Sequence, residues 1–262
     1  WQDKVYYLGK EYPAGYFAAG VLNVSHNLFV TITGEGGFLL DAYAIAKFGD
    51  REQLEELLPV LWESVENMLR SLRQVPPFSL WNMEAELGKM KAMLAKDRID
   101  QLLDNPEEKM WFLAYLRAGI LLPISIYHFV IAAWHLETYY LHRLGKRDET
   151  HFAVAFHDFY HDPSTKEVLE KMFVPTIEPF DANPRLRSSY TFARDPKDEK
   201  KMIFVNRVFF SSYMDFYVYD LLNGMHWGHA PSLCECCLKY FLTTDSHKPK
   251  YCDGMAPQNP HY

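Results

Sequence analysis

The four cysteines of this 262-residue chain all lie near its C-terminal end, and they constrain how that end can fold. Cys234 and Cys237 form a Cys-x-x-Cys pair, the spacing at which a tight turn points two thiolates at one tetrahedral ion. A short hydrophobic stretch follows at 240–242, and Cys252 then supplies a third thiol. This order predicts a zinc-ribbon-like tail over residues 231–262, with Zn²⁺ bound by the three cysteines.

A closed structural zinc site takes four ligands, so the tail needs one more. His247 is the fourth ligand that we select within the tail, and His261 and Cys236 are the alternatives. A ligand beyond Tyr262 is also compatible with the pattern. Disulfides or buried free thiols are the competing interpretations. Four cysteines at one end do not make the framework of a disulfide-rich secreted domain, and they fit the reducing cytoplasm better.

The residues from His229-Ala-Pro through the two cysteines to Tyr-Cys-Asp carry a resemblance. They resemble the C-terminus of an uncharacterised family of bacterial and phage-borne proteins, in which a mostly helical body precedes a zinc-ribbon-like tail. The tail is also similar to the CGNR-type zinc fingers of predicted transcription regulators. The resemblance implies that Cys234, Cys237 and Cys252 are the first three ligands and that Cys236 occupies a variable position. It also implies a fourth cysteine shortly after Tyr-Cys-Asp, beyond this sequence, and nucleic-acid binding by analogy alone.

Composition and charge limit the classes of protein to which the chain can belong. Hydrophobic residues make up 48% of it and charged residues 23%, so it can bury a substantial core as one large or two modest domains. The net charge of −7 argues against a broad, non-specific nucleic-acid-binding surface, although a local basic patch remains compatible with it.

The uncharged stretch 118–134 contains Pro123 and His128, and is shorter than a typical spanning helix. We therefore expect a buried core helix there. From the clustered cysteines and the residues at the start of the chain, we also expect a cytoplasmic protein without a signal peptide.

Hydrophobic spacing and capping signals predict a mainly α fold, a multi-helix body with a small N-terminal β element and the zinc-ribbon-like tail. Asp50 is placed to cap one helix and Asn105-Pro106 to start another, which Pro123 should kink or break. We expect the helical body, with its short N-terminal strands, to span residues 1–182. A connector follows at 183–201, and an aromatic helix that packs on the body occupies 202–230.

The predicted connector holds the most basic stretch of the chain. Arg185, Arg187 and Arg194 lie in or beside it, and with Lys239 in the tail they are our candidates for nucleic-acid contact. A solvated loop is the simpler interpretation of the same charges. The aromatic residues after Met202 are expected to be core residues of a helix, because a base-stacking platform usually lies on strands or loops among cations.

A second candidate site lies at His157 and His161, whose i, i+4 spacing puts two imidazoles on one helix face. Asp158 or Asp162 could add a carboxylate, but Asp162-Pro163 is also a helix start. The sequence favours a non-enzymatic binding or regulatory protein whose zinc-ribbon-like tail engages nucleic acid or a protein partner. The alternatives are a metal-dependent hydrolase or nuclease that uses the two histidines, and a structural subunit of a complex or homo-oligomer.

Overall fold

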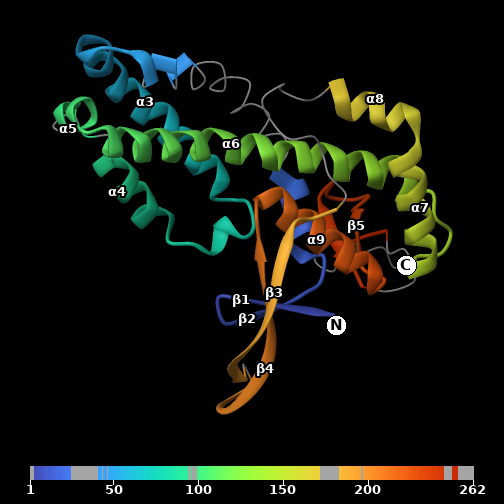
Figure 1. Cartoon of the computed structure of the whole chain (residues 1–262). Helices are drawn as coiled ribbons and strands as arrows, with labels where there is room; N and C mark the ends of the chain where they lie inside the picture. The colour runs from blue at the N-terminus through green and yellow to red at the C-terminus, as the bar shows by residue number, and fades with distance from the viewer. Residues whose placement is uncertain are drawn as a thin grey trace. The chain divides into compact units, whose positions relative to one another are not determined.

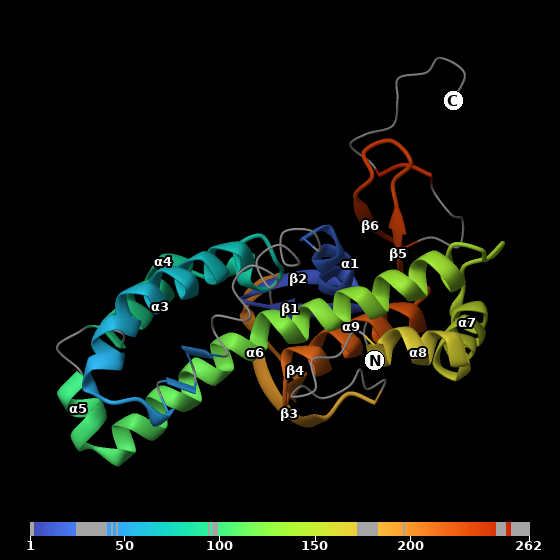
Figure 2. The same cartoon turned by 90° about the horizontal axis from the view of Figure 1, so that it is seen from above.

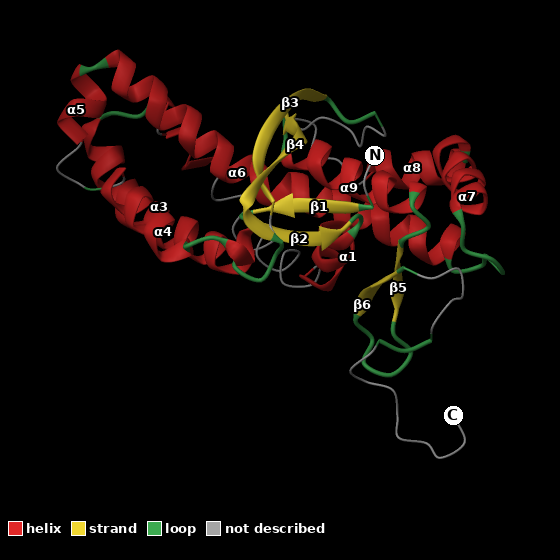
Figure 3. Cartoon of the chain, turned by 90° about the horizontal axis from the view of Figure 1, so that it is seen from below, coloured by secondary structure: helices red, strands yellow, loops and turns green. Residues whose placement is uncertain are grey.

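The computed structural model confirms a mainly helical chain with small antiparallel strand pairs (Figures 1 and 3). The described residues are 3–24, 41–95 except 43, 46 and 94, 99–171, 183–244 except 196, and 250–252. Contacts divide the chain into two units, Trp1–Asn23 with His128–Tyr262, and Val24–Tyr127. The long helix α6 (Pro106–Leu136) contributes residues to both units.

The Val24–Tyr127 unit is built from helices. In addition to the first part of α6, it contains α3 (Arg51–Leu72), a short 3-10 turn η2 (Phe78–Leu80), α4 (Met83–Met93) and α5 (Ile99–Asp104). The predicted cap of α3 is confirmed: the Asp50 carboxylate accepts a hydrogen bond from the Gln53 backbone N–H at 3.0 Å, and the Gln53 side chain accepts one from the Asp50 N–H. One face of α3 and the segment after it contribute the buried residues Leu54, Leu58, Leu61, Val65, Leu72, Val75 and Phe78. The later helices α4, α5 and α6 contribute Met83, Leu87, Ile99, Leu102, Phe112 and Leu116.

The other unit joins the two ends of the chain. Its N-terminal part contains β1 (Lys4–Tyr7), β2 (Lys10–Pro13), α1 (Tyr16–Val21) and η1 (Leu22–Val24). After α6 come the π-helical turn η4 (Glu137–Leu141), α7 (Glu149–His161), α8 (Pro163–Lys171), β3 (Leu186–Asp195), β4 (Asp198–Phe210), α9 (Tyr213–His226), β5 (Ala230–Leu233) and β6 (Tyr240–Thr243). The strands form the antiparallel pairs β1–β2, β3–β4 and β5–β6.

Helices α1 and α9 form the centre of this unit, and they approach each other closely at two glycines. A methyl group added to Gly224 would lie 2.8 Å from the Gly15 Cα, so neither backbone could come so near with a larger residue there. The Asp220 carboxylate on α9 accepts hydrogen bonds from the backbone N–H groups of Gly15, at 3.1 Å, and Ala18, at 2.9 Å. A buried acid from the C-terminal part of the chain therefore caps the first turn of α1.

The buried position of Asp220 predicts a pH dependence of stability. Burial raises the pKa of Asp220 from about 3.8 to about 6, although the α1 N–H groups lower it. Because the folded state then holds this proton more tightly than the unfolded state, the contribution is favourable at low pH and declines as pH rises from about 4 to about 6. The decline amounts to at most about 3 kcal/mol, with no further change from this group at higher pH. Urea unfolding at pH 4.5 and pH 7 should show this decline in the wild type, and an Asp220→Asn variant should lack that part of the pH profile.

The structure corrects the prediction for residues 183–225. The stretch predicted to be a connector and the first part of the predicted aromatic helix instead form β3 and β4, and the helix begins only at Tyr213. Ile203, Val205 and Phe209 are β-branched or aromatic residues at alternating positions, which suits a pleated strand better than a helix. Ser212 then caps α9 by accepting a hydrogen bond from the Asp215 N–H.

Of the two effects predicted for Pro123, a kink or a break in its helix, the break was wrong, because α6 continues through this residue. A proline removes one backbone donor and crowds the preceding turn, and the packing of a long helix can offset that cost. Beyond Pro123, α6 buries Ile126, Phe129 and Val130. In the parts of the chain that the structure describes, no helix combines the length and apolar character needed to cross a membrane.

Candidate metal centre

The strand pair β5–β6 positions the first two candidate ligands. Cys234 directly follows β5, and its N–H donates to the Lys239 carbonyl at 2.9 Å, which extends the pairing by one step. The Leu238 N–H donates back to the Cys234 carbonyl at 3.0 Å, and Leu238 adopts a left-handed conformation with φ of 55°. The chain therefore makes the tight turn that the Cys-x-x-Cys spacing predicts, with Cys237 inside it.

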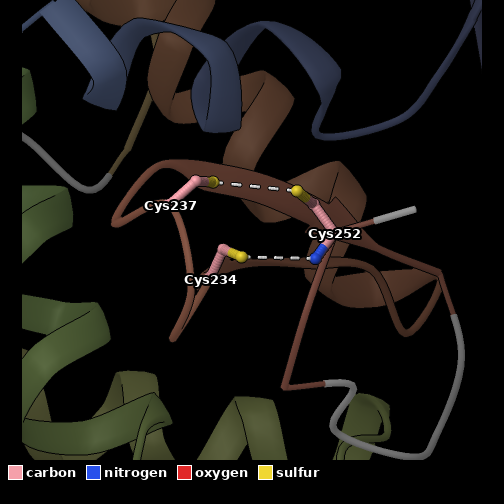
Figure 4. Close-up of side chains that lie close together, drawn as sticks. All are labelled: Cys234, Cys237 and Cys252. Carbon is pink, nitrogen blue, oxygen red and sulfur yellow. Dashed lines mark hydrogen bonds between the residues drawn. The ribbon is translucent and has the colours of Figure 1, made fainter. Parts of the chain in front are cut away.

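Residues 250–252 bring the third cysteine to this turn. The Glu235 N–H donates to the Lys250 carbonyl at 2.9 Å, so the returning segment lies beside the turn. The Cys252 N–H in turn points at the Cys234 Sγ, 3.5 Å away. Figure 4 shows the three cysteines converging from these two segments.

The sulfur positions fit a tetrahedral metal ion. The Sγ atoms of Cys234, Cys237 and Cys252 all lie within 4.8 Å of one another, and those of Cys237 and Cys252 are 3.8 Å apart (Figure 4). Two thiolates bound to one Zn²⁺ at about 2.3 Å in tetrahedral geometry lie about 3.8 Å apart. All four cysteines are free thiols. This arrangement could hold a metal ion, as the spacing predicts.

Backbone donors favour the ionised form of the buried ligand. The N–H of Cys237, and then that of Cys252, lower the pKa of Cys234 to about 6, although burial opposes the shift. The thiolate is the form of cysteine that binds metal, and a thiol with this pKa is mostly ionised at neutral pH. Backbone N–H groups of the turn and of the returning segment therefore favour the form of Cys234 that can bind a metal ion.

The described residues provide three of the four ligands that a closed site needs. Cys236 is exposed and does not belong to the cluster. His247 and His261, the other candidates within the chain, lie outside the described residues. The identity of the fourth ligand, with His247 as our choice, stays a prediction.

The base of the β5–β6 pair is buried in the unit formed by the chain ends. The Arg147 guanidinium is 1% exposed, and it donates to the Pro231 carbonyl at 3.3 Å and to the Thr243 Oγ1 at 3.4 Å. On β6, Asn23 also exchanges two hydrogen bonds with the Tyr240 backbone, at 2.6 and 2.8 Å. Hydrogen bonds thus fix β5 and β6, the strands on either side of the cysteine turn, to the rest of the unit.

The two histidines that we considered as a second metal site contact each other on α7. The rings of His157 and His161 stack with centroids 4.3 Å apart, and His161 Nδ1 contacts the His157 carbonyl at 2.8 Å. Asp162 accepts hydrogen bonds from the Tyr140 hydroxyl and from the Ser164 N–H, which confirms its role as a helix start. Within the described part of the chain, the cysteine cluster is the only group of three or more potential ligands close enough to share an ion.

The four candidates for nucleic-acid contact fall in two places. Arg187 and Arg194 lie on β3, and Arg185 lies at its base, where its N–H donates to Asp215 at 2.9 Å. Lys239 is exposed and belongs to the cysteine turn, where its carbonyl accepts from Cys234. The structure therefore assigns three of these basic residues to the β3–β4 pair and one to the candidate metal centre.

Comparison with known proteins locates one family in the C-terminal part of the chain. The sequence profile of a family described as "Family of unknown function (DUF6076)" matches residues 181–262, a range that includes β3–β4, α9 and the three cysteines. This match does not confirm the resemblance to CGNR-type zinc fingers or to zinc ribbons. Comparisons with curated proteins and with solved structures give no match.

Proposed function

We propose that the chain is a zinc-binding protein that acts by engaging a macromolecular partner, without catalysis at the metal. The spacing of the three sulfurs carries this proposal, since the 3.8 Å between Cys237 and Cys252 is the edge of a tetrahedral thiolate site. Thiolate ligands favour Zn²⁺ over the hard cations that prefer oxygen. The role of the zinc is then structural, as is typical of cysteine-rich sites.

The zinc would join two segments that have little core of their own. Around the buried Cys234, the turn exposes Glu235, Cys236 and Leu238, the last with 70% of its surface accessible. A metal bridge from the turn to Cys252 supplies the folding energy that burial does not provide there. The exposed Leu238 and Lys239 would then be held in a fixed position for nucleic acid or a protein partner, as we propose for the tail.

The metal content of purified protein tests the proposal. We expect one zinc per chain by native mass spectrometry, and a Cys237→Ser variant that retains less than about a tenth of it, because one thiolate of the site is lost. Cys236→Ser is the matched control, since it removes a neighbouring thiol that lies outside the cluster. Full zinc content in Cys237→Ser, or equal losses in the two variants, would refute the proposed site.

Removing the zinc from the wild type should loosen the cysteine turn and the segment 250–252, and should leave the strands β5 and β6 intact. Amide hydrogen exchange should accelerate by at least about tenfold at 234–239 and 250–252 when a thiol-reactive reagent releases the metal. The strands β5 and β6 should keep their protection, because Ala230, Ser232 and Thr243 are buried against the rest of the unit. Loss of protection throughout both strands would show that zinc maintains the base as well.

A further inference from the structure

The β3–β4 pair presents an exposed aromatic face. In its antiparallel register Phe192 lies opposite Phe204, and the neighbouring pairs on the same face are Tyr190 with Asn206 and Arg194 with Met202. The side chains of this face have a large exposed fraction: Tyr190 84%, Phe204 83%, Phe192 68% and Met202 53%. We call Tyr190, Phe192, Met202 and Phe204 the aromatic face. A cluster of exposed rings at this density marks an interaction surface.

The opposite face of the ribbon is already covered in part. Thr191, Ala193, Ile203 and Val205 alternate with the residues of the aromatic face and are half-buried. The pKa of Glu11 on β2 is lowered mainly by its hydrogen bond with Lys4, and the charge of Lys197 in the β3–β4 turn adds to the shift, so this turn lies near β2. Figures 1 and 2 show the long ribbon together with the short strands of the N-terminus. The uncovered side is therefore the aromatic face.

The charge of the ribbon is opposite in sign to that of the chain. Residues 183–210 contain seven basic and three acidic side chains, whereas the whole chain has a net charge of −7. At the turn that ends the ribbon, the three lysines Lys197, Lys200 and Lys201 are balanced by the three acids Asp195, Asp198 and Glu199. One of these lysines is already paired, since Lys201 lies 3.7 Å from Asp195. The excess positive charge therefore comes from the arginines Arg185, Arg187, Arg194 and Arg207, of which Arg194 lies on the aromatic face itself. This surface suits a negatively charged partner.

We propose that the aromatic face binds single-stranded nucleic acid, with unpaired bases stacked on Tyr190, Phe192 and Phe204. Each base offers a flat π-surface to an exposed ring, and the phosphates meet the basic side chains of the same ribbon. A duplex keeps its bases stacked internally and offers no such surface. A second copy of the chain would bring two basic ribbons together, and repulsion between like charges opposes that arrangement. The proposal is independent of the zinc site.

Fluorescence anisotropy of a labelled oligothymidine of about 20 nucleotides tests this surface with the full, zinc-loaded chain. We expect Phe204→Ala and Tyr190→Ala each to weaken binding by about 5- to 150-fold, the range that corresponds to the loss of one stacked base. Trp111→Ala is the matched control, because Trp111 is an aromatic residue with 62% exposure on α6. Circular dichroism should show all three variants folded, since the replaced rings are exposed.

Three further measurements distinguish single-stranded nucleic acid from the other possible partners of the aromatic face, which are a duplex, an acidic polypeptide and a second copy of the chain. Affinity should fall steeply between about 50 and 200 mM salt, and a duplex of the same length should compete poorly. Equal competition by the duplex or by polyglutamate would overturn the proposal, as would a dimer in light scattering that Phe204→Ala dissociates. Cys237→Ser should still bind the oligothymidine through the ribbon, so loss of zinc and loss of this activity are distinguishable. Binding that is unchanged in both aromatic variants also contradicts the proposal.

Discussion

Replacing Asp220 with alanine is expected to lower the free energy of unfolding by about 2–5 kcal/mol, because the N–H groups of Gly15 and Ala18 lose their acceptor. Asp220 is 1% exposed and Ala18 is fully buried, so water cannot replace the carboxylate without opening the contact between α1 and α9. Truncation would also leave a cavity between the two helices. A single side chain therefore links the N-terminal segment to the C-terminal part of the unit.

Urea unfolding followed by circular dichroism measures this effect, and two further variants define its cause. Asp220→Asn retains one acceptor oxygen, so its loss of stability should be smaller than that of Asp220→Ala. Asp158→Ala replaces an exposed aspartate on α7 and should change stability by less than about 0.5 kcal/mol. If Asp220→Ala matches Asp158→Ala, the proposed capping role of Asp220 is wrong.

The sequence predicted well those features that depend on neighbouring residues. The caps at Asp50 and Asp162 use side chains within three residues of the groups they bind, so the local pattern contains all the information needed. The cysteine cluster was predicted for the same reason, since the Cys-x-x-Cys turn is local and Cys252 is the remaining thiol with a hydrophobic stretch before it. The fold class follows from helical periodicity over long segments.

The errors and omissions concern contacts between distant residues. Asp220 lies 202 residues from Ala18, and nothing around it in the sequence distinguishes a buried cap from a surface acid. Arg147 follows Gly145-Lys146 in a polar stretch that resembles a helix end, although its side chain is buried. The β3–β4 ribbon was missed because its aromatic residues run without a break into those of α9, so that helical and strand spacing overlapped. Identifying the ribbon as strands also places its rings on a strand beside Arg194, which is closer to the usual setting of a base-stacking platform than a helix would be.

Replacing Arg147 is expected to cause a second large loss of stability, and Arg147 is bonded to the strands that carry the candidate metal centre. Its buried guanidinium bonds both strands of the β5–β6 pair through Pro231 and Thr243, and lies 5.9 Å from the centre of the Phe152 ring. Burial lowers the pKa of Arg147, and the negative charge of the buried Glu137 raises it. Arg147→Met keeps much of the volume but removes the charge and both hydrogen bonds, so we expect a loss of about 3–5 kcal/mol, the range for breaking a buried charged network.

The partner of that charge can be tested in a double-mutant cycle measured by urea unfolding. If the weaker charge compensation of Glu137, whose Oε1 also lies 3.9 Å from His142 Nδ1, causes most of the loss, then Glu137→Gln in the Arg147→Met background should restore at least about 1 kcal/mol. Arg143→Met, at an exposed arginine of the same segment, should be nearly neutral. No recovery in the double variant would assign the loss to the bonds with Pro231 and Thr243 instead. In that event zinc should leave Arg147→Met faster than it leaves the wild type, because the base that positions Cys234 is then the element that has loosened.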